Sequence, residues 1–542
     1  MNPPGAGTAH PSATGNTLDD LFRRLDELND IGASLSSEHD LKLLLEKIVL
    51  AAKRITRADG GTLYLLADDR RALHFEIVRT DSLNIAFGGS SAQSASGLFP
   101  DLPLYRADGS PNDCMVAAYA AITGNTVSIA DAYAAQGFDF SGTRQFDART
   151  GYRSRSFLTV PMKNHEGEVI GVLQLINAID TPGGQVVPFS PADQRLAESL
   201  ASQAAVALSN RQLVAQLETL FESFIKLINL AIDEKSPYTG GHCQRVPELT
   251  MMLAEAAAAT REGPLADFTL TDKDRYELRI AALLHDCGKV TTPVHVVDKA
   301  TKLQTLFDRI HLIDTRFEVI RRDAEVRKWR SIAEGMVAEI ADATYRDFCR
   351  QLEADREALR RANIGCEKMA DADIAQVHQI AGRYRWTAPD GRQQAFLNAD
   401  EVENLTIRSG TLTAAERDII NHHIVATIRM LEQLPWPKHL KNVPEYASGH
   451  HERMDGKGYP RGLQRDQMSW QARMMGIADI FEALTAKDRP YKEGMGLAQA
   501  LEILERFSQS GHIDADLYEV FIKGEVFRRY AEAFLRPQQI DC

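Results

Sequence analysis

The sequence has few cysteines, and none of them is spaced like a disulfide framework or a zinc-binding pair. Six cysteines are scattered along 542 residues, which is typical of free thiols in a reducing compartment. The sequence also contains no secretory signal and no apolar run close to the roughly 18 residues that a membrane-spanning helix needs. We therefore expect a cytoplasmic protein that does not insert into membranes.

Basic charge is scarce as well. The chain carries 62 Lys and Arg against 75 Asp and Glu, which gives a formal net charge of −13. Binding to a nucleic-acid polymer requires a basic surface, so this composition argues against such a partner. A small anionic ligand needs only a local group of Arg and Lys, and such a ligand remains compatible with the sequence.

The chain is too long for one hydrophobic core, and changes of pattern along it indicate several domains. Residues 1–16 are rich in Pro, Gly and Ser, and this composition predicts disorder. Residues 17–192 mix helical periodicity with short strands, which predicts an α+β domain. One long helix is expected over 193–234, and an all-α domain is expected over 235–537.

The long helix carries a heptad repeat of apolar residues. The members of this seam are Leu213, Leu217, Leu220, Phe224, Leu227 and Ala231. A seam of this length could pack within one chain. Its position between two domains favours the other arrangement, a parallel homodimer in which two copies of the helix pair.

The stretch that organises the carboxy-terminal half reads GHHERMDGKGYP over residues 449–460. Neighbouring side chains on a helix point about 100° apart, so His450 and His451 could serve two metal ions rather than one. The run resembles the HHExxDGxGYP signature of the HD-GYP family of metal-dependent cyclic dinucleotide phosphodiesterases. Every fixed position of that signature is present in this sequence.

A second metal-binding pattern is the dipeptide His285-Asp286, followed by Gly288 and Lys289. One imidazole and one carboxylate at this place resemble the HD motif of metal hydrolases, and a carboxylate can bridge two cations. Three further segments resemble parts of the family that carry metal ligands, namely 234–246, 412–423 and 477–484.

The resemblance implies a binuclear metal centre with seven ligands. These are His242, His285, Asp286, His423, His450, His451 and Asp479. Nitrogen and carboxylate donors without a thiolate favour two divalent iron or manganese ions over structural zinc. Some members of the family hold a third metal, for which Glu234 or Tyr238 would be the candidate ligand, but we expect two. His422, beside the ligand His423, is expected to be a bystander.

The resemblance also implies roles in catalysis and in substrate binding. Asp286 and Lys289 are the expected catalytic residues, and the expected substrate contacts are Lys289, Tyr459, Arg489 and Lys492. The implied reaction is the hydrolysis of cyclic di-GMP to linear pGpG, with GMP as a further product. Two alternatives stay open: hydrolysis of another cyclic dinucleotide, and a signalling protein that binds cyclic di-GMP without turnover.

The two central ligand motifs are much further apart in this sequence than in the family. A long, highly charged segment of helical periodicity separates His285 from His423, so we expect an inserted helical subdomain over about 306–405. A small hairpin is expected around the Pro389-Asp390-Gly391 turn. No ligand motif falls inside the insertion, and we therefore expect it to be structural.

The amino-terminal domain resembles GAF domains, most closely those of cyclic-nucleotide phosphodiesterases. The runs 150–164 and 167–177 are similar to the distal half of that family, in which a small molecule occupies a closed pocket. The family's Asn-Lys…Phe-x-x-x-Asp-Glu motif has Ala178 and Gln194 in place of Lys and Glu, so its internal salt bridge is missing. The domain is expected either to bind a small regulatory ligand or to serve only in dimerisation.

Overall fold

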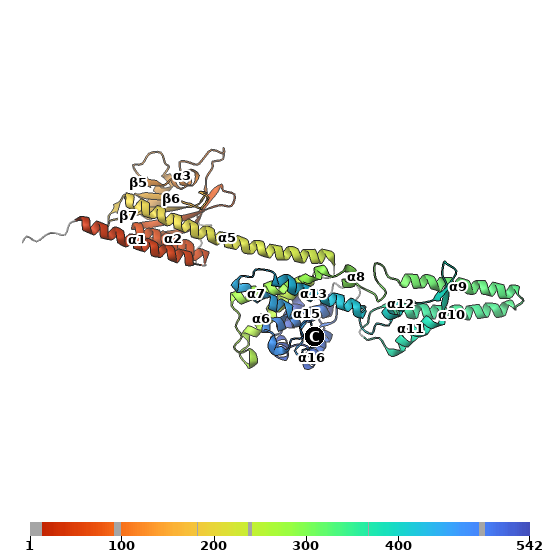
Figure 1. Cartoon of the computed structure of the whole chain (residues 1–542). Helices are drawn as coiled ribbons and strands as arrows, with labels where there is room; N and C mark the ends of the chain where they lie inside the picture. Colours follow the sequence, from red (N-terminus) through yellow and green to blue (C-terminus); the bar gives the residue numbers. More distant parts are fainter. Residues whose placement is uncertain are drawn as a thin grey trace, which may run out of the picture. The chain divides into compact units, whose positions relative to one another are not determined.

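The computed structural model describes residues 13–38, 40–91, 99–180, 183–236, 241–366, 368–486 and 494–542. The chain divides into two compact units, Met1–Phe221 and Glu222–Cys542. The boundary falls inside one continuous helix, α5 (Pro191–Lys235), which covers the predicted segment 193–234 (Figure 1). Within the described ranges, every helix is too short or too polar to span a lipid bilayer.

The first unit is built around one antiparallel sheet with the strand order β3-β2-β1-β7-β6-β5, in which β4 also pairs with β2 and β8 with β7. The strands are β1 (Ala58–Leu66), β2 (Ala72–Thr80), β3 (Ile85–Phe87), β4 (Leu102–Pro103), β5 (Val127–Ile129), β6 (Phe157–Lys163), β7 (Val169–Ile179) and β8 (Val186–Val187). The helices besides α5 are α1 (Ala13–Ser37), α2 (Leu41–Thr56), α3 (Val116–Thr123) and α4 (Ser141–Thr150).

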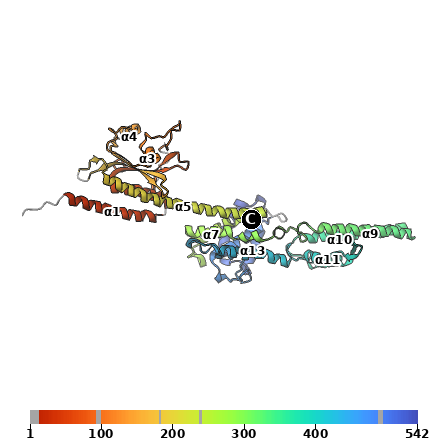
Figure 2. The ribbon, with the colours of Figure 1, turned by 45° about the horizontal axis from the view of Figure 1, so that its top comes forward.

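Helices cover both faces of this sheet because neighbouring strand residues point to opposite sides. Leu63 of β1 packs with α1, α2 and the start of α5, whereas the next residue, Tyr64, packs with α3. Figure 2 shows the same layers, with α3 and α4 on one side of the sheet and α1 and α5 on the other. The predicted α+β fold is therefore confirmed.

The amino-terminal boundary differs from the prediction. Helix α1 begins at Ala13, so the end of the segment 1–16 is helical rather than disordered, and its earlier residues lie outside the described residues. The composition of the segment hid the helix because its Pro residues and all but one of its Gly residues precede Ala13, and only Gly15 lies inside α1. Helix α1 is then tied to α5 by an ion pair between Arg24 and Asp193.

The second unit is helical. Its elements outside the insertion are α6 (His242–Ala259), α7 (Asp272–Leu284), the 3-10 turn η2 (Cys287–Thr291), α8 (Val294–Val297), α13 (Ala414–Glu432), α14 (Val443–Ser448), α15 (Trp470–Thr485), α16 (Leu497–Gln509), α17 (Ala515–Lys523) and α18 (Val526–Phe534). Helix α6 packs against α7 and α15, α14 packs against α7 and α13, and α13 packs against η2. Helices α6, α7, α13, α14 and α15 are consequently packed around one region of the unit.

The expected insertion has a hydrophobic core of its own, which extends from Leu303 to Leu405. It consists of α9 (Ile310–Ala333), α10 (Ala338–Asn363), α11 (Asp371–Arg383), β9 (Arg385–Thr387), β10 (Gln393–Ala395) and α12 (Ala399–Leu405). Helices α9 and α10 lie side by side (Figure 1). Strands β9 and β10 pair antiparallel, which confirms the predicted hairpin, and Gly391 adopts a positive φ in its turn.

Candidate metal centre

All seven side chains predicted as metal ligands meet where the helices of the second unit converge. They arrive from the start of α6 (His242), the end of α7 (His285 and Asp286), the middle of α13 (His423), the end of α14 (His450 and His451) and the middle of α15 (Asp479). Six of the seven side chains are at most 13% exposed, and that of His451 is partly exposed. The ligand residues belong to five segments that are far apart in the sequence, so the cluster forms only when the helices pack together.

The seven side chains form two groups that share one carboxylate. One group contains Asp286 with His242, His285 and Asp479, and the other contains Asp286 with His423, His450 and His451. In each group the ligand atoms lie within 4.8 Å of one another. The Oδ2 atom of Asp286 faces the first group and its Oδ1 atom faces the second. Asp286 is therefore placed to bridge two ions.

The spacing within the groups matches that of ligands around a small cation. A metal–ligand distance of about 2.1 Å with octahedral geometry places adjacent ligands about 3.0 Å apart and opposite ligands about 4.2 Å apart. The Nε2 atom of His242 lies 3.1 Å from Asp286 Oδ2 and 3.2 Å from Asp479 Oδ1. The Nε2 atom of His423 lies 3.2 Å from Asp286 Oδ1 and 3.2 Å from Nε2 of His451.

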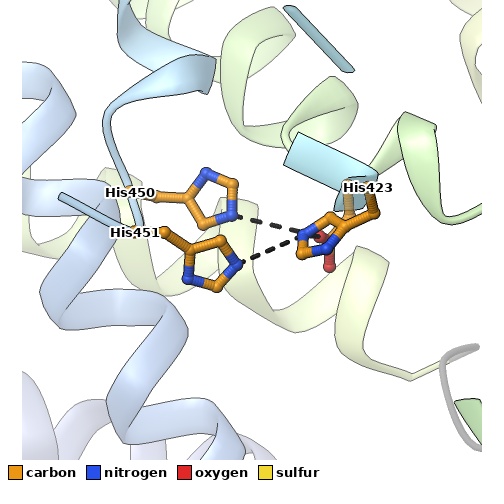
Figure 3. A group of neighbouring side chains, drawn as sticks. His423, His450 and His451 are labelled. Atoms are coloured by element: carbon orange, nitrogen blue, oxygen red, sulfur yellow. Dashed lines mark hydrogen bonds and ion pairs between the residues drawn. The ribbon is translucent and has the colours of Figure 1, made fainter. Parts of the chain in front are cut away.

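Hydrogen bonds outside the cluster set the tautomers of three ligand histidines. The Nδ1 atoms of His285, His423 and His450 lie 2.7, 2.5 and 2.7 Å from the carbonyl oxygens of the residues three positions earlier. A carbonyl can only accept, so each Nδ1 carries the proton and each Nε2 presents a lone pair to the cluster. Figure 3 shows how the rings of His450 and His451 turn toward His423.

Lone pairs that face a carboxylate require a cation between them. Nε2 of His450 and Oδ1 of Asp286 are both buried, and neither atom has a hydrogen-bond partner within the described part of the chain. An unpaired buried polar atom costs free energy, and two such atoms 4.0 Å apart define a place for a positive charge. The donor set and its orphan atoms therefore fit divalent cations.

Burial and neighbouring charges keep His450, His451 and Asp479 in the protonation state that binds a metal ion. Burial lowers the pKa of His451 to about 4 and that of His450 well below its ordinary value, so both rings are neutral near pH 7. Burial raises the pKa of Asp479, but the hydrogen bond and charge of His242 outweigh it and hold that pKa well below its usual range. Asp479 is therefore ionised.

Comparison with protein-family models supports both domain assignments that the sequence predicts. A GAF-domain model matches residues 40–208, and two HD-domain models match residues 239–364 and 399–517. The chain carries a GAF domain and an HD domain. The two HD matches together contain all seven side chains of the cluster, and residues 365–398 of the insertion lie between them.

Parts of the chain are similar to several curated enzymes. A cyclic di-GMP phosphodiesterase of Pseudomonas aeruginosa is 36% identical over 116 residues, 21% of this chain and 27% of the relative. A cyclic di-GMP phosphodiesterase of Thermotoga maritima is 34% identical over 133 residues, 23% of this chain and 35% of the relative. The 3'3'-cGAMP-specific phosphodiesterase 3 of Vibrio cholerae is 26% identical over 291 residues, 54% of this chain and 35% of the relative.

This chain therefore spans about a third or less of the length of these relatives. The matches confirm the resemblance to cyclic dinucleotide phosphodiesterases that the motifs predict.

Of the four residues besides Asp286 that are predicted for catalysis or substrate binding, two lie beside the cluster, and the other two are not described by the structure. Lys289 lies 2.5 Å from Asp286 Oδ2, and although burial lowers its pKa, the charges of Asp286 and Asp479 raise it overall. The ring of Tyr459 stacks on His451 with centroids 4.8 Å apart. The predicted substrate contacts Arg489 and Lys492 lie outside the described residues.

Among the described residues, the other candidate ligands that the sequence suggested do not join the cluster. His422 is exposed on α13, and Glu234 is exposed near the end of α5. Tyr238, the other candidate for a third metal, lies outside the described residues. Neither Cys243 nor Cys287 belongs to a ligand group, although each follows a ligand residue and is buried.

Sequence reasoning missed one residue of the HD domain, Glu482. Its Oε2 atom lies 2.5 Å from Nδ1 of His242, and its Oε1 atom accepts hydrogen bonds from Arg245. Burial raises the pKa of Glu482, but the charges and hydrogen bonds of His242 and Arg245 together outweigh burial and lower it. The sequence feature that could have identified Glu482 is its spacing, because it follows Asp479 by three positions and therefore lies on the same face of the helix.

We expect Glu482→Gln to weaken metal binding by about 10- to 100-fold, as is typical when the carboxylate behind a metal-ligating histidine is lost. The substitution removes the negative charge that orients His242 and pairs with Arg245. Titration of the metal-free protein with Mn²⁺ measures the effect. Glu502→Gln, an exposed position on α16, is the matched control, and equal affinities in the two variants would contradict the role of Glu482.

Proposed function

We propose that this chain is a metal-dependent phosphodiesterase that hydrolyses cyclic di-GMP to linear pGpG, with GMP as a further product. The observation that carries the proposal is the pair of ligand groups that share Asp286, because two ions held by one bridging carboxylate suit phosphodiester hydrolysis. The choice of substrate is supported by the names of the relatives from Pseudomonas aeruginosa and Thermotoga maritima.

The proposed cofactors are two divalent ions per chain, iron or manganese. Five imidazoles and two carboxylates supply only nitrogen and oxygen donors, and no cysteine belongs to either described group, which favours these ions over structural zinc. When bound, the ions lower the pKa of water and neutralise charge on the phosphoryl group.

The side chains around the ligands have separate proposed tasks. Asp286 holds one carboxylate oxygen toward each ligand group, which fixes the distance between the two halves of the site. The ammonium of Lys289, held against Asp286, is placed to donate to a phosphoryl oxygen or to the leaving oxygen. The ring of Tyr459 restricts His451 by stacking. Arg489 and Lys492 are proposed, by resemblance, to contact the phosphate and guanine.

To test the substrate assignment, the protein loaded with Mn²⁺ or Fe²⁺ is incubated separately with cyclic di-GMP, 3'3'-cGAMP and a nucleoside monophosphate. The products are then separated by chromatography. We expect cyclic di-GMP to be linearised to pGpG and the monophosphate to be untouched. Preferred hydrolysis of 3'3'-cGAMP, the substrate named for the Vibrio cholerae relative, would change the assigned dinucleotide. Hydrolysis of the monophosphate alone would refute the phosphodiesterase assignment.

We also propose that α5 pairs with a second copy of itself and connects the GAF domain with the HD domain. The predicted seam lies on the surface: Leu217, Leu220 and Leu227 are 63%, 52% and 58% exposed. The opposite side of the same helix is buried at Ile225 and Ile232. A continuous exposed apolar stripe at heptad spacing matches a parallel two-helix seam. A small regulatory ligand of the GAF domain is proposed to act through this helix.

A further inference from the structure

The last turn of α5 lies against η2, the short 3-10 turn that follows the dipeptide His285-Asp286. The Nζ atom of Lys235, the last residue of α5, lies 2.5 Å from the carbonyl oxygen of Val290 and 3.4 Å from that of Lys289. Lys235 and η2 both belong to the second unit. The contact therefore joins the end of the long helix to the turn that carries Lys289.

The sequence of this turn explains why it needs a hydrogen-bond donor from another helix. In a 3-10 helix each carbonyl oxygen accepts from the N–H of the residue three positions later. For Val290 that residue is Pro293, which has no N–H. The carbonyl of Val290 therefore lacks its regular partner. A lysine ammonium is a strong donor to a carbonyl at the end of a helix, and Lys235 supplies it.

The residues next to Lys235 hold the end of α5 closely against the HD domain. Ile232, three residues before Lys235, is buried, and Oγ of Ser236 lies 2.5 Å from Oδ1 of Asp298 at the end of α8. The space enclosed between α5, η2 and α8 has a volume of only about 10 Å³, which leaves room for one water molecule at most. A shift of the end of α5 therefore moves η2 as well.

The other side of η2 is fixed to α13. The N–H of Gly288 donates to Oγ1 of Thr427 over 2.9 Å. A Cβ atom at Gly288 would lie 2.0 Å from the carbonyl oxygen of His423, which is closer than two non-bonded atoms can approach. The turn is therefore held from two sides, by α13 at Gly288 and by α5 at Val290. Lys289 lies between these two points.

The position of η2 sets the position of the Lys289 ammonium. The N–H of Lys289 donates to the carbonyl oxygen of Asp286 over 2.9 Å, and its Nζ atom lies 2.5 Å from Oδ2 of the same residue. We propose that Lys235 is a positioning residue, which holds η2 in the arrangement that keeps Lys289 on Asp286. This role rests on the proposed function, in which Lys289 donates to the phosphoryl oxygen or to the leaving oxygen.

Lys235→Met should lower kcat for cyclic di-GMP by about 10-fold, because the substitution removes a charged hydrogen bond. The metal content should not change, since Lys235 belongs to neither ligand group. Lys235→Arg keeps a charged donor and should restore most of the rate. Lys226→Met, an exposed position on the same helix, is the matched control and should leave the rate unchanged. The measurements are kcat, KM and elemental analysis of the full chain.

A double variant separates positioning of Lys289 from a general effect on the fold. If Lys235 acts through Lys289, Lys235→Met should cause no further loss of kcat in the Lys289→Met protein, because the group that it positions is already absent. A contact that only stabilises the domain would slow both backgrounds by the same factor. Equal losses in the two backgrounds, or an unchanged rate in Lys235→Met alone, would overturn the proposal.

The position of Lys289 is also measured without turnover, by acetylating the full chain with an N-hydroxysuccinimide ester and following Lys289 by mass spectrometry. Because Asp286 holds this amine, we expect Lys289 to react about 10-fold faster in Lys235→Met, and at the original rate in Lys235→Arg and Lys226→Met. If the metal-loaded protein hydrolyses no cyclic dinucleotide, the proposed function fails, and acetylation still decides the role of Lys235. Equal rates of acetylation in the unchanged protein and in Lys235→Met would then overturn that role.

Discussion

Replacing Asp286 by asparagine should abolish metal binding in both ligand groups and, with it, the proposed hydrolysis of cyclic di-GMP. Asp286 is the one residue common to the two ligand groups, and asparagine keeps the shape of the side chain but loses the charge that holds two cations. The loss of metal affinity should exceed the about 10- to 100-fold that removal of a supporting residue costs. Elemental analysis and turnover measure the two effects.

Two control variants separate metal binding from the other effects of this substitution. Lys289→Met removes the ammonium that contacts Asp286 but no ligand, so we expect it to retain metal and to slow turnover. Asp267→Asn, an exposed position, should change neither. Two metal ions per chain in Asp286→Asn, with turnover like that of the unchanged protein, would refute the bridging role.

Inserting one residue after Gln216 in α5 should change turnover by about 5- to 150-fold, which corresponds to the usual coupling free energy between two sites. One extra residue rotates the helix beyond it by about 100° and breaks the heptad seam, whereas seven extra residues add two nearly complete turns and restore its phase. We therefore expect the seven-residue insertion to recover most of the original rate.

The measurements are turnover with cyclic di-GMP and the molar mass in solution. Leu220→Lys combined with Leu227→Lys tests the seam itself, because both side chains are more than half exposed and two lysines would repel their copies in a paired helix. The variant should be monomeric while its HD domain still binds metal. If both insertions and removal of residues 1–210 leave rate and molar mass unchanged, the GAF domain does not control the enzyme through α5.

Local sequence patterns were sufficient to predict many of the structural elements and ligand motifs of this protein. The heptad seam, the β9–β10 hairpin and each ligand motif are local features, because a helix period, a turn residue or a His-Asp dipeptide is visible within a few positions. The predicted α+β fold followed from the same kind of pattern. The start of α1 at Ala13 was the exception, since Pro and Gly composition masked a helix boundary.

The sequence by itself determined which side chains can bind metal, because imidazole and carboxylate chemistry belongs to the residues. Only the tertiary structure decided that Asp286 faces both groups, that Glu482 supports His242, and that the buried Lys299 is paired with Glu416. These relations join residues from different helices. Distance and burial between such residues depend on how the helices pack, which no local pattern encodes.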